Sequence, residues 1–104
     1  MILRRGRFTD LVERQLDLFE SETELLTEAK EADAAWSTAD ADESEELYGD
    51  YQLVVDAVGS ALHEIRETYA ATLDGGTGGE YRDAFDKAAR KRFGRLAAFL
   101  EDAG

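Results

Sequence analysis

The chain has 104 residues, with 24 Asp and Glu against 12 Lys and Arg, so its formal net charge is −12. This length leaves room for one core, and we expect residues 1–104 to form a single domain. Cysteine is absent, which excludes disulfides, thiolate zinc sites and cysteine nucleophiles. No apolar run approaches the roughly 20 residues of a membrane-spanning helix, so the sequence predicts a soluble, cytoplasmic protein without stable membrane attachment.

The beginning of the chain is basic and is followed by the first amphipathic segment. Residues 1–7 carry three arginines, and we expect them to form a flexible N-terminus. Thr9 is a suitable N-cap, and apolar residues then recur at helical spacing as far as Trp36. The pattern predicts one helix over about 9–36.

The second segment has the most regular apolar pattern. A polar, acidic stretch over 37–44 separates it from the first. The seam that follows has alternating spacings of three and four residues, which is typical of a packed helix. Its members are Tyr48, Tyr51, Val55, Val58, Leu62, Ile65, Tyr69 and Thr72. We therefore predict a helix over about 42–73.

Four glycines within residues 74–79 mark the next boundary. This string predicts a flexible hairpin, since glycine disfavours helix. Thr77 and Glu80 then have the spacing of a capping box, and apolar residues recur from Tyr81 onwards. A third helix is expected over about 79–102. Together the segments predict an all-α protein, an antiparallel up-down-up three-helix bundle.

Charge is unevenly distributed along the chain, because the acidic excess lies in the first helix and the loop after it. The third helix contains a basic stretch made of Lys87, Arg90, Lys91, Arg92 and Arg95. A basic stripe of this kind also occurs in proteins that bind nucleic acid or acidic lipid. In an up-down-up bundle, however, it has acidic neighbours, and we expect pairing within the molecule and no nucleic-acid partner. The expected neighbours are Glu28, Glu31, Asp40, Asp42 and Glu43.

Two charged residues fall within apolar faces. Glu22 lies in the apolar face of the first helix and Arg92 in that of the third, at similar heights if each helix is straight. Helix two reaches the same level near Ser60, with His63 one turn away. The pattern predicts a polar core layer of Glu22, Ser60, His63 and Arg92, with an ion pair that fixes helix register. An oligomer interface and a small-ligand pocket are the alternatives.

The sequence contains no catalytic signature, and we expect no cofactor and no bound metal. His63 is the one histidine, and Ser60 stands where a Glu-x-x-His metal motif needs its glutamate. The glycine string lacks the Lys-Ser/Thr and the preceding strand of a phosphate-binding loop.

A second contact surface is predicted on helix two, which is apolar beyond its main seam. Its expected members are Leu53, Ala57, Ala70 and Ala71. We therefore interpret the chain as a small acidic accessory or adaptor protein that acts through a protein partner or through a homodimer. The alternative is a small-ligand-binding module, or an accessory enzyme subunit, with a polar pocket between the helices.

Overall fold

The computed structural model describes residues 6–97. Most of the basic N-terminus predicted over 1–7, and the end of the helix predicted over 79–102, lie outside these residues. Of the N-terminal arginines, Arg7 is described, and its Nη1 lies 3.7 Å from Glu80 Oε2.

Residues 6–97 form an all-helical structure, as predicted, but with four α-helices in place of three. They are α1 (Thr9–Glu22), α2 (Leu25–Ser37), α3 (Ala41–Ala70) and α4 (Gly75–Phe93), followed by the 3-10 helix η1 (Gly94–Ala97). The prediction of a three-helix bundle was therefore wrong in the number of helices. None of these helices has both the length and the apolar character that crossing a bilayer requires.

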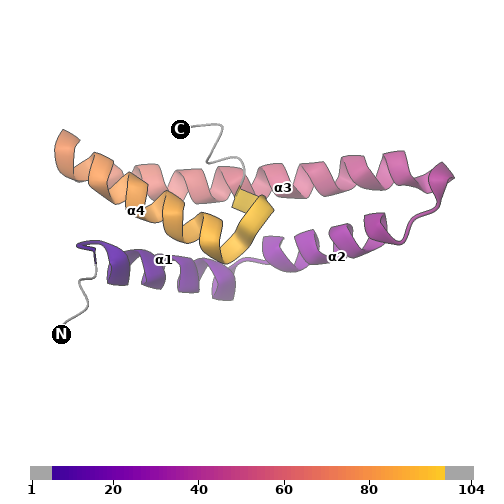
Figure 1. The fold of residues 1–104 in the computed structure, drawn as a ribbon, viewed down its shortest axis with the longest axis horizontal. Coiled ribbons are helices and arrows are strands. Elements are labelled where there is room, and N and C mark those ends of the chain that lie inside the picture. Colours follow the sequence, from indigo (N-terminus) through magenta and orange to yellow (C-terminus); the bar gives the residue numbers. More distant parts are fainter. Residues whose placement is uncertain (1–5, 98–104) are drawn as a thin grey trace.

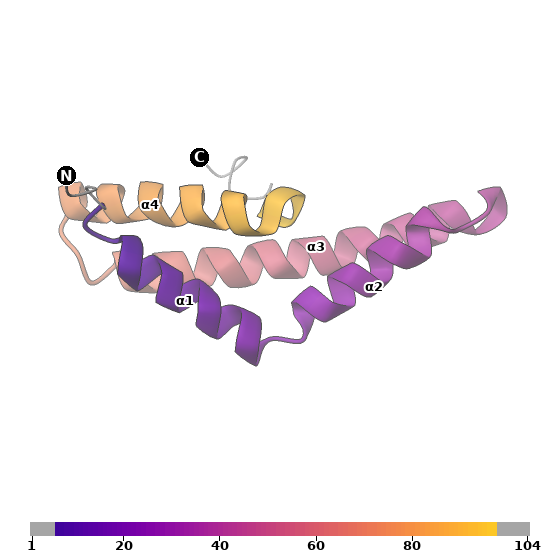
Figure 2. The same cartoon turned by 60° about the horizontal axis from the view of Figure 1, so that its bottom comes forward.

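The predicted helix over 9–36 is interrupted at Thr23. This residue is extended, with φ −97° and ψ 145°, and its Oγ1 accepts a hydrogen bond from the Leu25 amide at 3.2 Å. A threonine side chain that bonds to a nearby amide offers the backbone an alternative to the helix. The chain turns here, so that α1 and α2 meet at an angle and follow α3 end to end (Figure 2).

The glycine string belongs to a helix and not to a hairpin loop. Asp74 is the N-cap of α4, and its Oδ1 accepts from the Thr77 amide at 2.8 Å. The expected Thr77–Glu80 capping box was therefore misplaced by three residues. Gly78 is buried, and a Cβ at that position would come within 3.5 Å of the Ala70 carbonyl oxygen. The glycine thus lets α4 start close to the end of α3. This contact favours a helical conformation for the glycine string over the expected flexible loop.

The helices pack around α3, which runs along the whole molecule (Figure 1). At one end, α4 contacts both α1 and α3; at the other, α2 and the first half of α3 form an antiparallel pair. The resulting body is elongated, with extents of 53 × 31 × 23 Å. Its fully buried large side chains come from α1, α3 and α4 and are Val12, Leu16, Val58, Leu62, Tyr81 and Phe85.

An aromatic cluster joins α2 to α3 at the other end. Trp36 stacks on Tyr51, with ring centroids 5.7 Å apart and an interplanar angle of 17°. Tyr48 lies 4.9 Å from the same indole, although 43% of its surface is exposed. These contacts anchor the α2–α3 pair where the rest of the core does not reach.

Two glycine substitutions are expected to change stability in opposite directions. Gly94 ends α4 with φ +57°, which L side chains rarely adopt, so Gly94→Ala should lower the free energy of unfolding by about 1–2 kcal/mol. Gly49 lies within α3 with open space around its Cα, so Gly49→Ala should raise it by about 0.5–1 kcal/mol. Urea unfolding followed by circular dichroism measures both changes. A change of the same sign in both variants would contradict either the positive φ at Gly94 or the helical position of Gly49.

Candidate functional site

A groove lies between α1 and α3 on the described surface. It consists of two adjoining hollows of about 560 and 400 Å³ that share Gln15 and Ile65. We call it the α1–α3 groove. Its walls are Gln15, Leu18, Phe19, Glu22 and Thr23, with Ala61, Glu64, Ile65, Thr68, Tyr69 and Thr72. All of these residues except Thr23 and Thr72 belong to α1 or α3, and none belongs to α4.

The groove exists because α1 packs against α4 more closely than against α3. Phe8, just before α1, meets Tyr81 edge to face at 5.4 Å, and Phe19 meets Phe93 at 5.8 Å. These contacts turn the buried face of α1 toward α4. Leu18 lies on the flank of α1 that faces away from α4, and 50% of the Leu18 surface is exposed.

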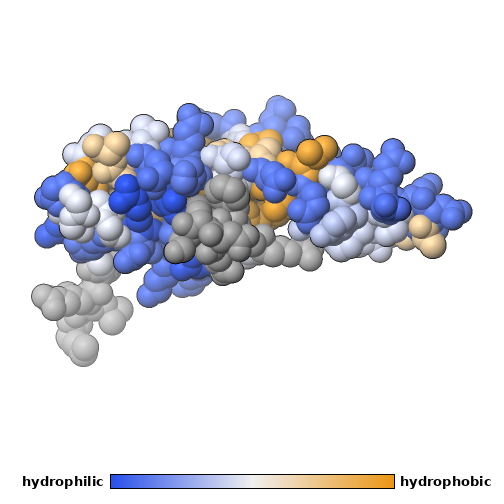
Figure 3. Space-filling model, turned by 90° about the horizontal axis from the view of Figure 1, so that it is seen from above, coloured by the Kyte–Doolittle hydropathy of each residue, from blue (hydrophilic) through white to orange (hydrophobic). Residues whose placement is uncertain are grey.

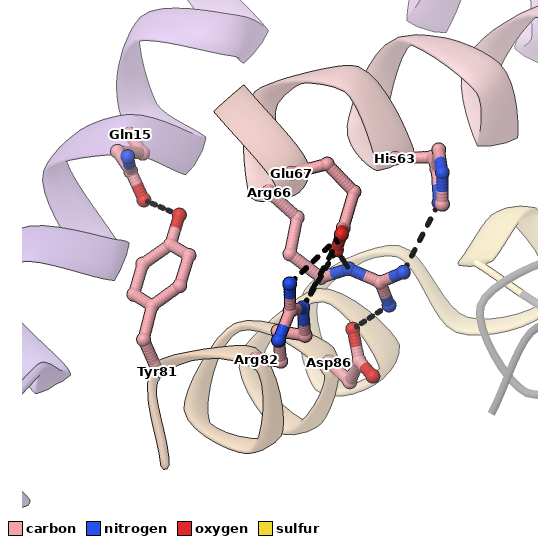
Figure 4. A network of polar contacts seen from close by, with 7 residues as sticks. All are labelled: Gln15, His63, Arg66, Glu67, Tyr81, Arg82 and Asp86. Carbon is pink, nitrogen blue, oxygen red and sulfur yellow. Dashed lines mark hydrogen bonds and ion pairs between the residues drawn. The ribbon is translucent and has the colours of Figure 1, made fainter. Parts of the chain in front are cut away.

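Tyr81 and Gln15 connect the core to the floor of the groove. The Tyr81 side chain is buried, and its hydroxyl donates to Gln15 Oε1 at 2.7 Å (Figure 4). Burial raises the pKa of the Tyr81 phenol to about 12, because the phenolate would lose its hydration. The hydrogen bond fixes Gln15 between the two hollows.

A polar network lies between α3 and α4 (Figure 4). Arg66, which is buried, donates from Nε to Glu67 Oε2 and from Nη1 to Asp86 Oδ1, both at 2.8 Å. Its Nη2 lies 3.0 Å from His63 Nδ1, and Arg82 donates to both carboxylate oxygens of Glu67. We call these five residues the Arg66 network.

The electrostatics of the Arg66 network favour the charged forms of Arg66, Glu67 and Arg82. The hydrogen bond from Arg82, more than that from Arg66, holds the pKa of the Glu67 carboxyl below its usual value. Burial alone would lower the pKa of Arg66, but hydrogen bonds and charges from Asp86 and Glu67 reverse this and raise it. Because these groups bind one another, the network holds α4 against α3.

The structure does not bring together the predicted polar layer. Glu22 and Ser60 are exposed, His63 belongs to the Arg66 network, and Arg92 binds carboxylates of α1. The predicted Glu22–Arg92 ion pair was wrong. Arg92 binds the face of α1 that carries Glu13, Asp17 and Glu20. Glu22 lies on the opposite face of this helix and lines the groove.

The basic stretch of the chain does pair within the molecule at Arg92, but not with the expected neighbours. Arg92 Nη1 donates to Asp17 Oδ1 at 2.8 Å, Nη2 donates to Glu13, and Glu20 Oε1 lies 3.7 Å away. These carboxylates follow one face of α1. The acidic loop after α2 lies at one end of α3, whereas α4 runs along the other end (Figure 1). The basic residues of α4 are therefore far from this loop.

The surface predicted from Leu53, Ala57, Ala70 and Ala71 is divided by the fold. Ala70 is 3% exposed and lies in the core, whereas Leu53 is 70% exposed. Figure 3 looks onto the side of α3 that faces away from α1 and shows apolar side chains near the middle of a mostly hydrophilic face. Leu53 and Ala70 therefore cannot belong to one contact surface.

Several residues that matter in the structure were not identified from the sequence. Arg66 follows Leu62 by four residues and so falls on the buried face of α3, which is a readable signal for a buried cation. Leu18 and Ile65 fit ordinary core positions, and no sequence pattern distinguishes them from residues that a neighbouring helix covers.

Within residues 6–97, no group of three or more His, Cys, Asp or Glu side chains could hold a metal ion. No family model, curated protein or solved structure matches the chain.

Loss of Asp86 is expected to destabilise the fold. Asp86→Ala removes an acceptor from the buried Arg66 guanidinium and should lower the free energy of unfolding by about 2 kcal/mol. Asp83→Ala removes the same charge from an exposed position of α4 and should change it by less than about 0.5 kcal/mol. Urea unfolding of both variants measures the difference, and similar losses would show that net charge, not the Arg66 contact, is responsible.

Because the pKa of the buried Tyr81 is raised, we expect the fold to lose stability at alkaline pH. The folded pKa of Tyr81 is about 12 against an ordinary value of 10.0, so the unfolded chain releases this proton first. Stability is therefore complete below pH 10 and falls as the pH rises toward 12, by about 1 kcal/mol near pH 11. Urea unfolding at both ends of this range should show a smaller fall for Tyr81→Phe. The same fall should persist in Tyr48→Phe, since Tyr48 is exposed.

Proposed function

We propose that this protein is a non-catalytic interaction module that receives an α-helical segment of a partner protein in the α1–α3 groove. The observation that carries the proposal is a mostly uncharged groove, walled by two helices, in which Leu18 stays 50% exposed. An exposed large apolar side chain within a concave surface is typical of a contact site.

The dimensions of the groove suit a helix. Along α3, the wall from Ala61 to Tyr69 rises about 12 Å, which corresponds to roughly two helical turns, and Thr72 extends the wall beyond the end of the helix. A helix laid between α1 and α3 would complete a four-helix arrangement with α4. In such helix-in-groove recognition, apolar anchors at helical spacing enter the groove. Here they would contact Leu18, Ile65 and Tyr69.

The other occupants are less well supported. A small ligand prefers a site that encloses most of its surface and offers converging polar groups. Thr68 and Thr72 in the wall are exposed, and the Arg66 network lies on another side of α3. A second copy would bring an equal charge of −12 toward the first.

A designed peptide tests whether the groove receives a helix. The probe is a fluorescently labelled amphipathic helix of about five turns, with leucines along one face and lysines on its flanks. We expect it to bind the full chain, and Leu18→Glu should weaken binding at least about tenfold, because a carboxylate replaces an apolar contact. Fluorescence anisotropy measures the dissociation constant.

Leu53→Glu is the matched control. It places the same charge at a residue that is more exposed than Leu18 and does not line the groove. This variant should bind the peptide like the unmodified chain. If Leu53→Glu weakens binding as much as Leu18→Glu, the α1–α3 groove is not the docking site.

A further inference from the structure

We propose that the partner helix is cationic, with Lys or Arg side chains on both flanks of its apolar face. This inference rests on the proposed function, since it specifies the chemistry of the segment that enters the α1–α3 groove. It arises from the charges of the groove walls, which are independent of the apolar contacts discussed above.

Both charged residues in the groove walls are carboxylates. Glu22 comes from the end of α1 and Glu64 from α3, so each wall contributes one negative charge. No Lys or Arg lines the groove. Arg14 is exposed on α1 but is not part of the walls.

Three arginines elsewhere in the described structure already form ion pairs within the molecule. Arg66 and Arg82 bind carboxylates between α3 and α4, and Arg92 binds carboxylates of α1. By contrast, neither Glu22 nor Glu64 takes part in any ion pair within residues 6–97. Other exposed carboxylates, such as Glu45 and Glu46, are also outside these ion pairs, but Glu22 and Glu64 are the two that flank the apolar surface of the groove.

The two carboxylates are placed to act together on one ligand. Glu22 lines one hollow and Glu64 the other, and the hollows meet at Gln15 and Ile65. A helix whose apolar face lies over Ile65 would direct its two flanks toward α1 and α3. Long basic side chains pack their stems on apolar surface while their charged ends reach outward, which suits a groove with acidic walls.

The negative charges of Glu22 and Glu64 favour some occupants of the groove over others. Exposed ion pairs contribute modestly to affinity, but they steer association and disfavour partners of like charge. A second copy of this chain would present Glu22 and Glu64 to an equally acidic surface. A cationic amphipathic helix from another protein is the occupant that satisfies both the apolar and the charged part of the groove.

Two matched peptides test the inference. Both have the same leucine face and differ only in their flanks, which are lysine in one and glutamate in the other. We expect the lysine peptide to bind the full chain about tenfold or more tightly than the glutamate peptide, with a difference that shrinks as salt is added. The double variant Glu22→Lys/Glu64→Lys should reverse this preference, provided that circular dichroism shows unchanged helix content.

The control removes general charge effects. Glu45→Lys/Glu46→Lys makes the same change in net charge at exposed positions near the start of α3 and should keep the preference for the lysine peptide. An equal reversal in this control would overturn the inference. Equal binding of both peptides, weakened by Leu18→Glu, would also overturn it while leaving the groove as a helix-binding site. Binding of neither peptide would instead contradict the proposed function.

Discussion

Tyr81 lies at the point where α1, α3 and α4 meet, and the packing of that end of the molecule depends on it. Its ring contacts Phe8 at 5.4 Å and Tyr69 at 4.8 Å, and its hydroxyl donates to Gln15. Aromatic pairs of this kind contribute about 0.5–1.5 kcal/mol beyond the burial of their surface. Because these contacts hold α1 against α4, α1 does not close over α3, and the α1–α3 groove remains.

The distribution of charge follows from the same arrangement. Cations of α3 and α4 bind carboxylates between the helices, as Arg66 does with Asp86 and Arg92 with Asp17 and Glu13. Glu22 and Glu64, which line the groove, are exposed and take part in none of these ion pairs. Some of the acidic side chains behind the net charge of −12 are thus paired where helices meet, whereas the two carboxylates of the proposed binding groove are not.

The sequence pattern located the long helix α3 well and the interruptions of the other helices poorly. Apolar spacing alone carried the prediction across Thr23, because no glycine or proline marks a break there. Conversely, the glycines over 75–79 favoured a loop, whereas the cap at Asp74 and the close approach of Gly78 to Ala70 place them in α4. At the glycines a tertiary contact outweighs local propensity, whereas at Thr23 a local hydrogen bond from the Leu25 amide to the threonine side chain accompanies the break.

By itself the sequence determined the helical class, the extent of α3 and the absence of cysteine chemistry, because periodicity and composition are local properties of the chain. It also indicated that Arg92 pairs within the molecule. Only the tertiary structure decided that its partners lie on α1, that Glu22 enters a groove wall and that Leu18 stays exposed. These outcomes depend on the helix against which α1 packs and on the angle between α1 and α2 at Thr23. A repeating apolar pattern encodes neither.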